Sequence, residues 1–185
     1  MGAERTRQTG AGCPGALRAA GYEQTTVTEI ARRAGLSERT FFRHFADKRE
    51  VLFGGAAELQ EVFVTSIATA PAQATPMEAV AAALDAGAAL FQERREHSGA
   101  RQRIISATTE LRERELIKFA ALSAALADTL RTRGVPDPAA ALAAEAGLAV
   151  FKVAFGRWLS SPEQLPVSHF IHESLAELKS VASAG

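Results

Sequence analysis

The stretch Thr25–Leu52, TTVTEIARRAGLSERTFFRHFADKREVL, carries the strongest local signals in this chain of 185 residues. Thr26 and Glu29 stand three residues apart, which is the spacing of a capping box at the start of a helix. Apolar residues then recur on one helix face, at Val27, Ile30, Ala31 and Ala34. These features predict a first short helix over residues 27–34.

A turn and a second helix follow directly. Gly35 supplies a residue that readily adopts the left-handed conformation with which helices end. Ser37 is a residue type that caps the start of a helix. Phe41 and Phe45 lie four residues apart and therefore share one face, which we expect to point into the core of the domain. The second helix is thus predicted over residues 38–45.

The other face of this second helix carries the candidate functional side chains. They are Arg39, Thr40, Phe42, Arg43 and His44. Two short helices joined by a glycine-containing turn form a helix-turn-helix. Hydrogen-bond donors beside an exposed aromatic ring are typical of a helix that enters the major groove of DNA. Since helix-turn-helices also occur as plain packing units, these features alone leave both interpretations open.

Composition excludes several other classes of protein. With 47% hydrophobic residues the chain is not globally disordered, and 21 basic residues balanced by 21 acidic ones exclude a polybasic binder. The first 50 residues nevertheless hold nine Lys or Arg against six Asp or Glu. A polyanionic partner for this basic part and statistical scatter both explain the bias.

Cofactors and membranes are not expected. The single cysteine, Cys13, cannot form an intrachain disulfide or a cysteine-rich zinc site. The N-terminal residues are polar, and no uninterrupted apolar run reaches the ~18 residues of a membrane span. We therefore expect a cytoplasmic protein without a metal, a cofactor or a membrane partner.

The rest of the sequence predicts an all-α fold. Patterns typical of strands are almost absent, and the abundant Ala, Leu, Arg and Glu favour helix. Clusters of Gly and Pro divide the chain into helices expected near residues 16–20, 27–34, 38–45, 48–69, 77–97, 101–109, 111–133, 138–159 and 167–181. The expected domains are an N-terminal helix-turn-helix head over residues 1–52 and a C-terminal helical bundle over residues 53–185.

Residues 21–53, GYEQTTVTEIARRAGLSERTFFRHFADKREVLF, resemble the DNA-binding head of the TetR family of bacterial transcription regulators. The matching elements are Gly21-Tyr22, Thr25-Thr26-Val27, Ile30-Ala31, Ala34-Gly35-Leu36-Ser37, Thr40-Phe41-Phe42, His44-Phe45, Lys48 and Leu52. The resemblance implies a three-helix head, a larger helical ligand-binding body and no catalysis. It further implies a ligand-responsive regulator, usually a repressor, that binds a palindromic double-stranded DNA operator as a homodimer.

The resemblance also assigns residues to DNA. The implied DNA-binding residues are Thr26, Thr28, Arg33, Ser37, Arg39, Thr40, Phe42, Arg43, His44 and Lys48. Arg39 and Thr40 match base-reading positions, and Phe42 stands where the family often has a Tyr that packs on the sugar-phosphate and on thymine methyls. Most of the others match phosphate-contacting positions. For Arg33, a solvated helix face is the alternative.

The first helix departs from the family pattern. Residues 9–15, TGAGCPG, contain three glycines and a proline and so disfavour the long first helix that the family has. We expect an irregular start and a short helix over Ala16–Ala20. The alternative is that this stretch is out of frame relative to its ancestor.

The body is expected to bind a small apolar or acyl-type effector. Residues 101–114, RQRIISATTELRER, resemble a subgroup of TetR bodies thought to bind acyl-CoA-like ligands, so that Arg101 and Arg103 would hold an anionic headgroup. A surface salt-bridge ladder with nearby glutamates is the alternative. The apolar pocket is predicted to be lined by Phe63, Leu84, Phe91, Ile105, Leu122, Phe151, Phe155 and Trp158. Most apolar residues in such a set belong to a core.

Residues 139–159 and 167–181 match the two helices that form the four-helix dimer bundle of the family. Small residues would permit close helix approach there, at Ala143, Ala146, Gly147, Ala154 and Gly156. Packing within one monomer is the alternative for them.

A different class of function also stays open, namely an all-helical ligand-binding or enzymatic module with impaired or no DNA binding. Its chemistry would have to come from histidines such as His169 and His172, which lack a completing carboxylate or cysteine pattern.

Overall fold

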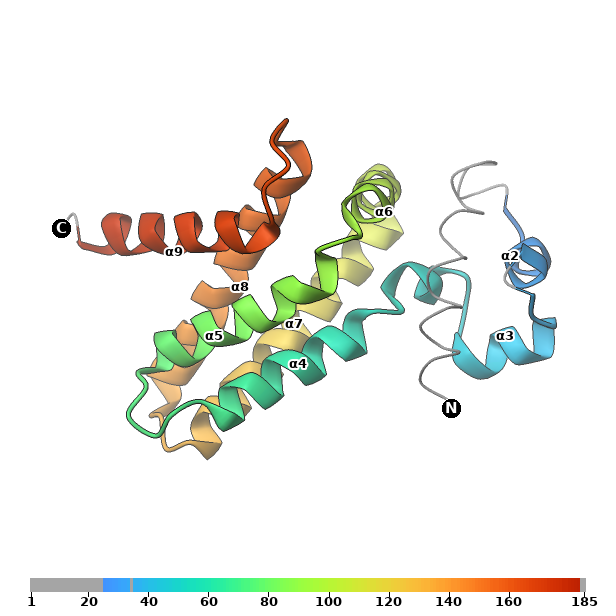
Figure 1. Cartoon of the computed structure of the whole chain (residues 1–185). Coiled ribbons are helices and arrows are strands. Elements are labelled where there is room, and N and C mark those ends of the chain that lie inside the picture. Colours follow the sequence, from blue (N-terminus) through green and yellow to red (C-terminus); the bar gives the residue numbers. More distant parts are fainter. Residues whose placement is uncertain (1–24, 34, 184–185) are drawn as a thin grey trace. The chain divides into compact units, whose positions relative to one another are not determined.

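The computed structural model describes residues 25–183 apart from residue 34 (Figure 1), and all regular elements in this part are helical. They are α2 (Val27–Arg33), α3 (Glu38–His44), the 3₁₀ helix η1 (Arg49–Phe53), α4 (Ala56–Thr69), α5 (Pro76–Ala88), the 3₁₀ helix η2 (Ala89–Phe91), α6 (Arg95–Ala107), α7 (Thr109–Thr132), α8 (Asp137–Ser160) and α9 (Val167–Ser183). The predicted all-α fold class is confirmed. The atypical residues 9–15 and the helix expected over 16–20 lie outside the described residues.

Two of the predicted helices are divided in the structure. The helix expected over residues 48–69 consists of η1 and α4, which are separated at Gly54 and Gly55. Consecutive glycines make a helix costly to continue, so the break is local in origin. The helix expected over 77–97 ends at Ala88, and the 3₁₀ helix η2 follows it. The Phe91 ring at the end of η2 packs against Phe155 of α8. Here tertiary packing overrides the local helix propensity.

The described chain forms two compact units. Unit 1 combines the described residues up to Ala57 with Glu96–Glu115, and unit 2 combines Glu58–Arg95 with the chain from Leu116 onward. The sequence predicted a continuous division between residues 52 and 53 instead. The reason for the difference is that α6 and the start of α7 share their core with the N-terminal helices.

The core of unit 1 is built from the helix-turn-helix and from α6 and α7. Ile30 and Phe41 are fully buried there, and so are Ile105 and Leu111 from the later helices. The hydrophobic residues of η1 complete the cluster, because Val51, Leu52 and Phe53 are all at most 5% exposed. The two short helices thus rest on a core to which distant parts of the sequence contribute.

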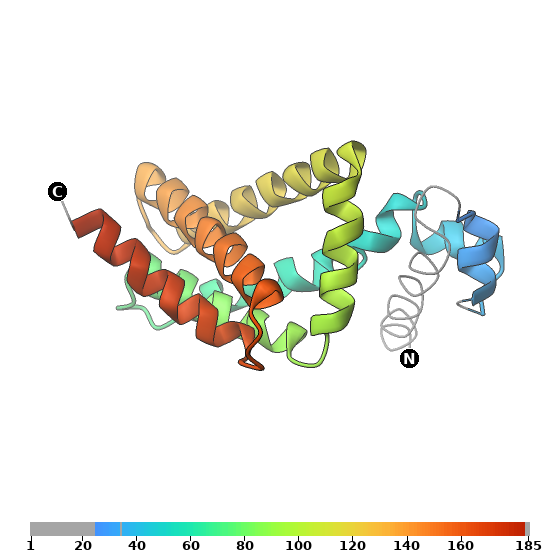
Figure 2. The same cartoon turned by 90° about the horizontal axis from the view of Figure 1, so that it is seen from above.

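Unit 2 is a helical bundle in which α5 packs against both α8 and α9 (Figures 1 and 2). Its core centres on fully buried side chains such as Phe63, Leu84 and Leu126. Gly147 of α8 allows close approach to α5, since a Cβ built there would lie 2.2 Å from Cγ1 of Val80. Helices α5 and α8 are therefore fixed to each other by a small residue.

Two helical stretches, Arg49–Thr69 and Asp137–Ser160, are long and apolar enough to cross a membrane by length and composition alone. The first is interrupted between η1 and α4. The second is α8, which buries one face in the core of unit 2, including Leu148, Phe151 and Trp158. Core helices of soluble proteins meet the same criteria of length and hydropathy.

Candidate nucleic-acid interface and effector site

The predicted caps of the helix-turn-helix are all present. The backbone N–H of Thr26 donates to Oε2 of Glu29 at 2.9 Å, and the N–H of Glu29 donates to Oγ1 of Thr26 at 3.2 Å. Gly35 has a φ of +68°, in the left-handed region. The N–H of Thr40 donates to Oγ of Ser37 at 3.2 Å, which caps α3. Short-range sequence signals therefore fix both ends of the turn.

Helix α3 has one buried and one exposed face. Phe41 and Phe45 are 0% and 6% exposed and their ring centroids lie 5.2 Å apart, which confirms the predicted inward face. Phe42 is 54% exposed although its ring lies edge-on to that of Phe41. The side chains of Arg39, Arg43 and His44 are also exposed, and Thr40 is half-buried. The predicted base-reading residues therefore share one surface with the exposed aromatic ring.

Several predicted phosphate contacts have partners within the protein. The hydroxyl of Thr28 donates to the Glu38 carboxylate, which joins α2 to the start of α3. Nζ of Lys48 donates to the backbone oxygen of Thr25 at 3.1 Å, which joins η1 to the start of α2. Arg33 is the last residue of α2, and its side chain lies outside the described part. Glu38 was not singled out from the sequence, because an acidic first-turn residue is an ordinary feature of helices.

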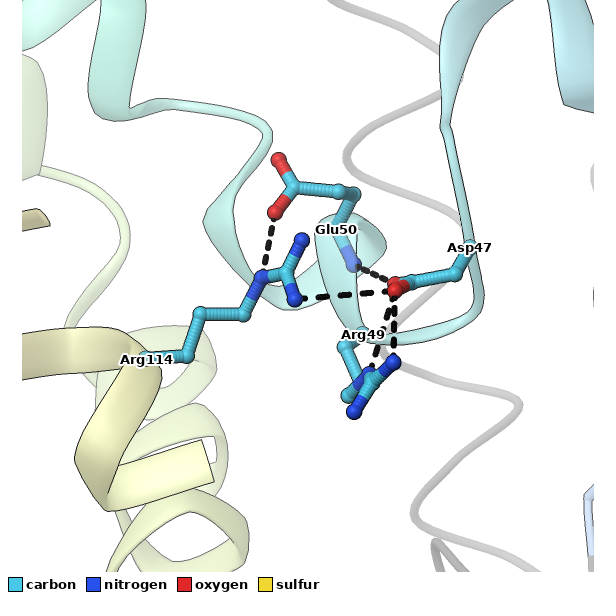
Figure 3. Close-up of polar contacts among 4 residues, drawn as sticks. All are labelled: Asp47, Arg49, Glu50 and Arg114. Atoms are coloured by element: carbon cyan, nitrogen blue, oxygen red, sulfur yellow. Dashed lines mark hydrogen bonds and ion pairs between the residues drawn. The ribbon is translucent and has the colours of Figure 1, made fainter. Parts of the chain in front are cut away.

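A charged cluster surrounds the start of η1 (Figure 3). Oδ1 of Asp47 accepts the N–H of Glu50 at 3.0 Å, and Oδ2 forms an ion pair with Arg49 at 3.0 Å. Arg114 of α7 donates from Nε to Oε1 of Glu50 at 2.6 Å and lies 3.6 Å from Oδ2 of Asp47. Partial burial raises the pKa of Asp47, but the Glu50 and Arg49 hydrogen bonds and the two arginine charges outweigh it, so the net pKa is lowered. Sequence analysis treated Arg114 only as the end of the 101–114 motif.

The predicted headgroup residue Arg101 has its contacts within unit 1. Nε of Arg101 donates to the backbone oxygen of Leu52 at 2.5 Å, and its guanidinium lies 5.2 Å from the centre of the Phe53 ring. Its carboxylate partner is Glu115, at 3.4 Å, so the ion-pair alternative describes it. Burial lowers the pKa of Arg101, and the Glu115 charge opposes this.

The other two α6 candidates also belong to unit 1. Ile105 is fully buried in the core of unit 1, and Arg103 is exposed in the same unit. The resemblance of residues 101–114 predicts a ligand-binding segment, whereas in the structure Arg101 contacts Leu52 and Glu115, and Ile105 is buried in the core of unit 1.

The remaining predicted lining residues meet in the core of unit 2. They form a packed aromatic cluster in which Phe151 contacts Phe63 and Phe155, with centroid distances of 5.8 and 5.7 Å. Phe91 lies 5.2 Å from Phe155, and Trp158 lies 5.4 Å from the same ring. Leu84 and Leu122 belong to the same core. The half-buried ring of Phe119, whose centroid lies 6.5 Å from that of Phe151, was not predicted to belong to this cluster. The only indication in the sequence is that Phe119 lies three residues before Leu122 on the same helix.

An apolar groove of about 920 Å³ runs between α8 and α9. Its lining includes Ala149, Val153, Ala176, Leu178 and Val181. Val153 and Val181 are 56% and 68% exposed, and Leu142 of α8 is 71% exposed. Of the small residues on α8, Ala143, Gly147 and Ala154 are buried within the monomer, while a Cβ at Gly156 would meet nothing within 4 Å. Packing within one monomer thus describes Ala143, Gly147 and Ala154, and a dimer contact at Gly156 stays a prediction.

The histidines of α9 lie in ion pairs at the surface. Nε2 of His172 is 2.8 Å from the Asp85 carboxylate of α5, and Nε2 of His169 is 3.1 Å from that of Glu173. Among the described residues, no group of three His, Cys, Asp or Glu side chains is arranged to hold a metal ion.

Comparisons with known families match both parts of the chain. Residues 16–53 match the family model of bacterial regulatory proteins, tetR family. Residues 74–183, which are more than half of the chain, match the model of the MftR C-terminal domain. A curated relative is the HTH-type transcriptional regulator TcmR from Streptomyces glaucescens, 41% identical over 68 residues. That match covers 37% of this chain and 30% of TcmR.

Two solved structures with bound acyl-CoA share the fold. The transcriptional regulator FadR from Bacillus subtilis, in complex with stearoyl-CoA, has a TM-score of 0.63 at 17% identity, covering 93% of this chain and 96% of that one. FadR from Thermus thermophilus, a transcriptional repressor in complex with lauroyl-CoA, has a TM-score of 0.57 at 21% identity, covering 94% and 93%. At these identities the likeness concerns the fold alone.

Proposed function

We propose that this chain, which belongs to the TetR family of bacterial regulatory proteins, acts as a ligand-responsive repressor that binds a palindromic DNA operator as a homodimer. It is a DNA-binding transcriptional regulator with a helix-turn-helix and a helical ligand-binding body. The observation that carries the DNA-binding part of the proposal is the exposed face of α3, where Arg39 and Arg43 flank the 54%-exposed ring of Phe42. Such a face suits the major groove. Phe41 and Phe45, on the buried face of α3, anchor the helix to the core of unit 1.

The residues of this face divide by the kind of contact they would make. Arg39 and Thr40 read base edges, and Phe42 packs on thymine methyl groups and sugars. The phosphate contacts come from residues at the helix ends and along the exposed faces, namely Thr26, Thr28, Arg33, Ser37, Arg43, His44 and Lys48. Phosphate contacts give affinity and register, whereas the base contacts give specificity.

Selection of DNA fragments from a random duplex pool tests the proposal. We expect a two-fold symmetric consensus whose half-site centres lie about one helical turn apart, with affinity that falls steeply as salt rises. Arg39→Ala should lose the preference at one base position of each half-site. Failure to enrich any sequence, with weak binding that has no salt dependence, would count against a DNA regulator.

The partner proposed for the groove between α8 and α9 is a second copy of this chain. The groove is apolar, and the exposed Val153 and Val181 side chains extend it. Apolar faces of this kind form the centre of stable homodimers. Val153→Asp should convert the dimer to a monomer in sedimentation and weaken operator binding. Leu116→Asp on α7, where the side chain is 65% exposed, is the matched control and should leave the dimer intact. The opposite pattern would contradict this interface.

The effector proposed for the aromatic cluster of unit 2 is an acyl-CoA or a related long-chain acyl compound. The fold shared with two acyl-CoA-bound regulators supports this class, and the half-buried rings of Phe91, Phe119 and Phe155 supply the apolar contacts. Arg101 is left out of the proposed effector site, because its guanidinium bonds the Leu52 carbonyl and pairs with Glu115.

The single tryptophan, Trp158, provides the test of the effector, since it lies within the cluster. Lauroyl-CoA and stearoyl-CoA should change its fluorescence and release the operator, whereas coenzyme A alone should do neither. An unchanged spectrum and unchanged operator binding with both acyl-CoAs would refute the acyl class. A regulator of this kind needs no catalytic group, cofactor or membrane, and it acts where the DNA is, in the bacterial cytoplasm.

A further inference from the structure

Two carboxylates flank the residue proposed to bind phosphate from η1. Asp47 directly precedes Lys48, and Glu50 follows it by two positions. Unpaired carboxylates beside a phosphate site oppose DNA binding, since like charges repel at these separations. The cluster around them is therefore part of the electrostatics of the DNA-facing surface.

Arg114 compensates both carboxylates from a distant part of the sequence. Its Nε donates to Glu50 at 2.6 Å, and its Nη1 lies 3.6 Å from Asp47. Figure 3 shows its side chain reaching from α7 to the start of η1, where Asp47 also caps the backbone N–H of Glu50. The Arg114 side chain is 30% exposed and that of Glu50 is 21% exposed, so the contacts are partly shielded from solvent. This arrangement fixes the segment from Asp47 to Glu50 and neutralises its charge at the same time.

Lys48 depends on this segment for its position. Its backbone lies between the two carboxylates, and its Nζ reaches Thr25 at the start of α2 with a bond of 3.1 Å. Arg101 holds the other end of η1 through the carbonyl of Leu52. Two arginines from α6 and α7 thus fix the short helix that follows Lys48.

We propose that Arg114 is a positioning residue for DNA binding, acting from outside the helix-turn-helix by neutralising Asp47 and Glu50 and thereby orienting Lys48 toward phosphate. The inference rests on the proposed DNA-binding function. Arg114 itself does not touch DNA. Its removal weakens binding to operator and to unrelated DNA by the same factor, because phosphate contacts carry no sequence information.

The test uses the full-length protein and three sets of variants. Arg114→Ala should weaken operator binding about tenfold, which corresponds to about 1.4 kcal/mol. The matched control is Arg112→Ala on the same helix, where the exposed side chain donates to Thr109; it should change binding by less than about twofold. The helical content and thermal unfolding of each variant are measured alongside.

The decisive measurement is a second substitution in the Arg114→Ala protein. Adding Glu50→Gln removes the carboxylate that accepts from Arg114 in the wild-type protein and should restore binding to within about threefold of wild type. Adding Glu110→Gln instead removes an exposed charge from α7 and should restore little. A purely structural role for Arg114 predicts no recovery from Glu50→Gln, since no contact is regained.

Any of three results would overturn the inference. No recovery with Glu50→Gln would mean that Arg114 has only a structural role. Equal recovery with Glu50→Gln and Glu110→Gln would mean that only the total charge matters. Operator binding that is unaffected by Arg114→Ala would mean that the contacts of Arg114 with Asp47 and Glu50 do not contribute to DNA binding. Failure of the proposed function is distinguishable from all three, because the wild-type protein would then select no operator at all.

Discussion

Helices α3 and α8 each bury one face, but they differ in what the other face offers. The seven-residue α3 exposes Arg39, Arg43 and His44 around a single aromatic ring. The 24-residue α8 exposes apolar side chains, with Leu142 71% and Val153 56% exposed. A cationic face suits a hydrated polyanion, whereas exposure of an apolar face to water is unfavourable and its burial against another protein lowers the free energy. The contrast is the one expected if α3 faces DNA and α8 faces the second copy of the chain proposed above.

The largest effect is expected from neighbouring phenylalanines on the two faces of α3. Phe41→Ala removes a fully buried ring and should lower the free energy of unfolding of unit 1 by about 3–5 kcal/mol. Phe42→Ala removes a ring that is 54% exposed and should change it by less than about 0.5 kcal/mol.

Chemical denaturation followed by circular dichroism measures both variants, and operator binding is measured in parallel. We expect both proteins to bind DNA poorly, the first because α3 is no longer held and the second because a contact is lost. If Phe42→Ala bound operator normally, the exposed face of α3 would not be the DNA-facing one.

The next effect compares two glycines of α8. A Cβ at Gly147 would lie 2.2 Å from Cγ1 of Val80, so Gly147→Ala forces a shift of α5 or α8. Overpacking of this kind costs about 1–3 kcal/mol, of which the better helix propensity of Ala offsets up to about 1 kcal/mol. Gly156→Ala meets no atom within 4 Å in one monomer and should raise stability by up to about 1 kcal/mol. Thermal unfolding that ranks the two variants in the reverse order would contradict the packing of α5 on α8.

Local signals explain why the helix-turn-helix could be predicted and the unit division could not. Caps at Thr26 and Ser37, the left-handed Gly35 and the four-residue spacing of Phe41 and Phe45 act within a few residues, so the sequence displays them directly. The inclusion of Ile105 in the core of unit 1 depends on a contact between distant segments. In the sequence, an apolar helical residue of the unit 1 core cannot be distinguished from one of the unit 2 core. Ile105 was assigned to the ligand pocket because it belongs to the short motif over residues 101–114.

A third comparison separates specificity from affinity on the proposed DNA face. Arg39→Ala should reduce discrimination between bases at one position by about 1–3 kcal/mol. Lys48→Ala should weaken all DNA about equally and reduce the slope of log affinity against log salt by about one. Because Nζ of Lys48 also bonds Thr25, a small loss of stability should accompany the second variant.

Binding titrations on operator and on scrambled DNA at several salt concentrations measure both effects. An unchanged base preference in the Arg39→Ala protein would place base readout on a different part of the helix-turn-helix.

The aromatic cluster shows a further limit of sequence analysis. Phe63, Phe151 and Trp158 were predicted to line a pocket, and the structure places all three in one core, where the Phe63 and Phe151 rings are in contact. A sequence shows that such residues are buried but not whether space remains among them, because packing and a pocket require the same apolar side chains. Phe119 escaped prediction for the related reason that its helix, α7, has both polar and apolar residues on most faces.

The smallest effect compares the two capping boxes, one in each unit. Thr75 and Glu78 at the start of α5 repeat the arrangement of Thr26 and Glu29: the N–H of Thr75 donates to Glu78 at 2.8 Å, and the N–H of Glu78 donates back at 3.3 Å. Replacing either threonine by alanine should lower stability by about 1 kcal/mol. Only Thr26→Ala should also weaken DNA binding, because only Thr26 belongs to the proposed interface.

The Thr75 box adds a dependence on pH. Hydrogen bonds from the backbone and side chain of Thr75 lower the pKa of Glu78 from its usual value of 4.5. A lowered pKa in the folded protein means that the stabilisation is complete above pH 4.5 and is lost as the pH falls through the folded-state value. The stability difference between wild type and Thr75→Ala should therefore shrink in acid, as measured by denaturation at pH 7 and pH 3. A difference that stayed constant over this range would mean that the Thr75 cap stabilises α5 without the ionised Glu78.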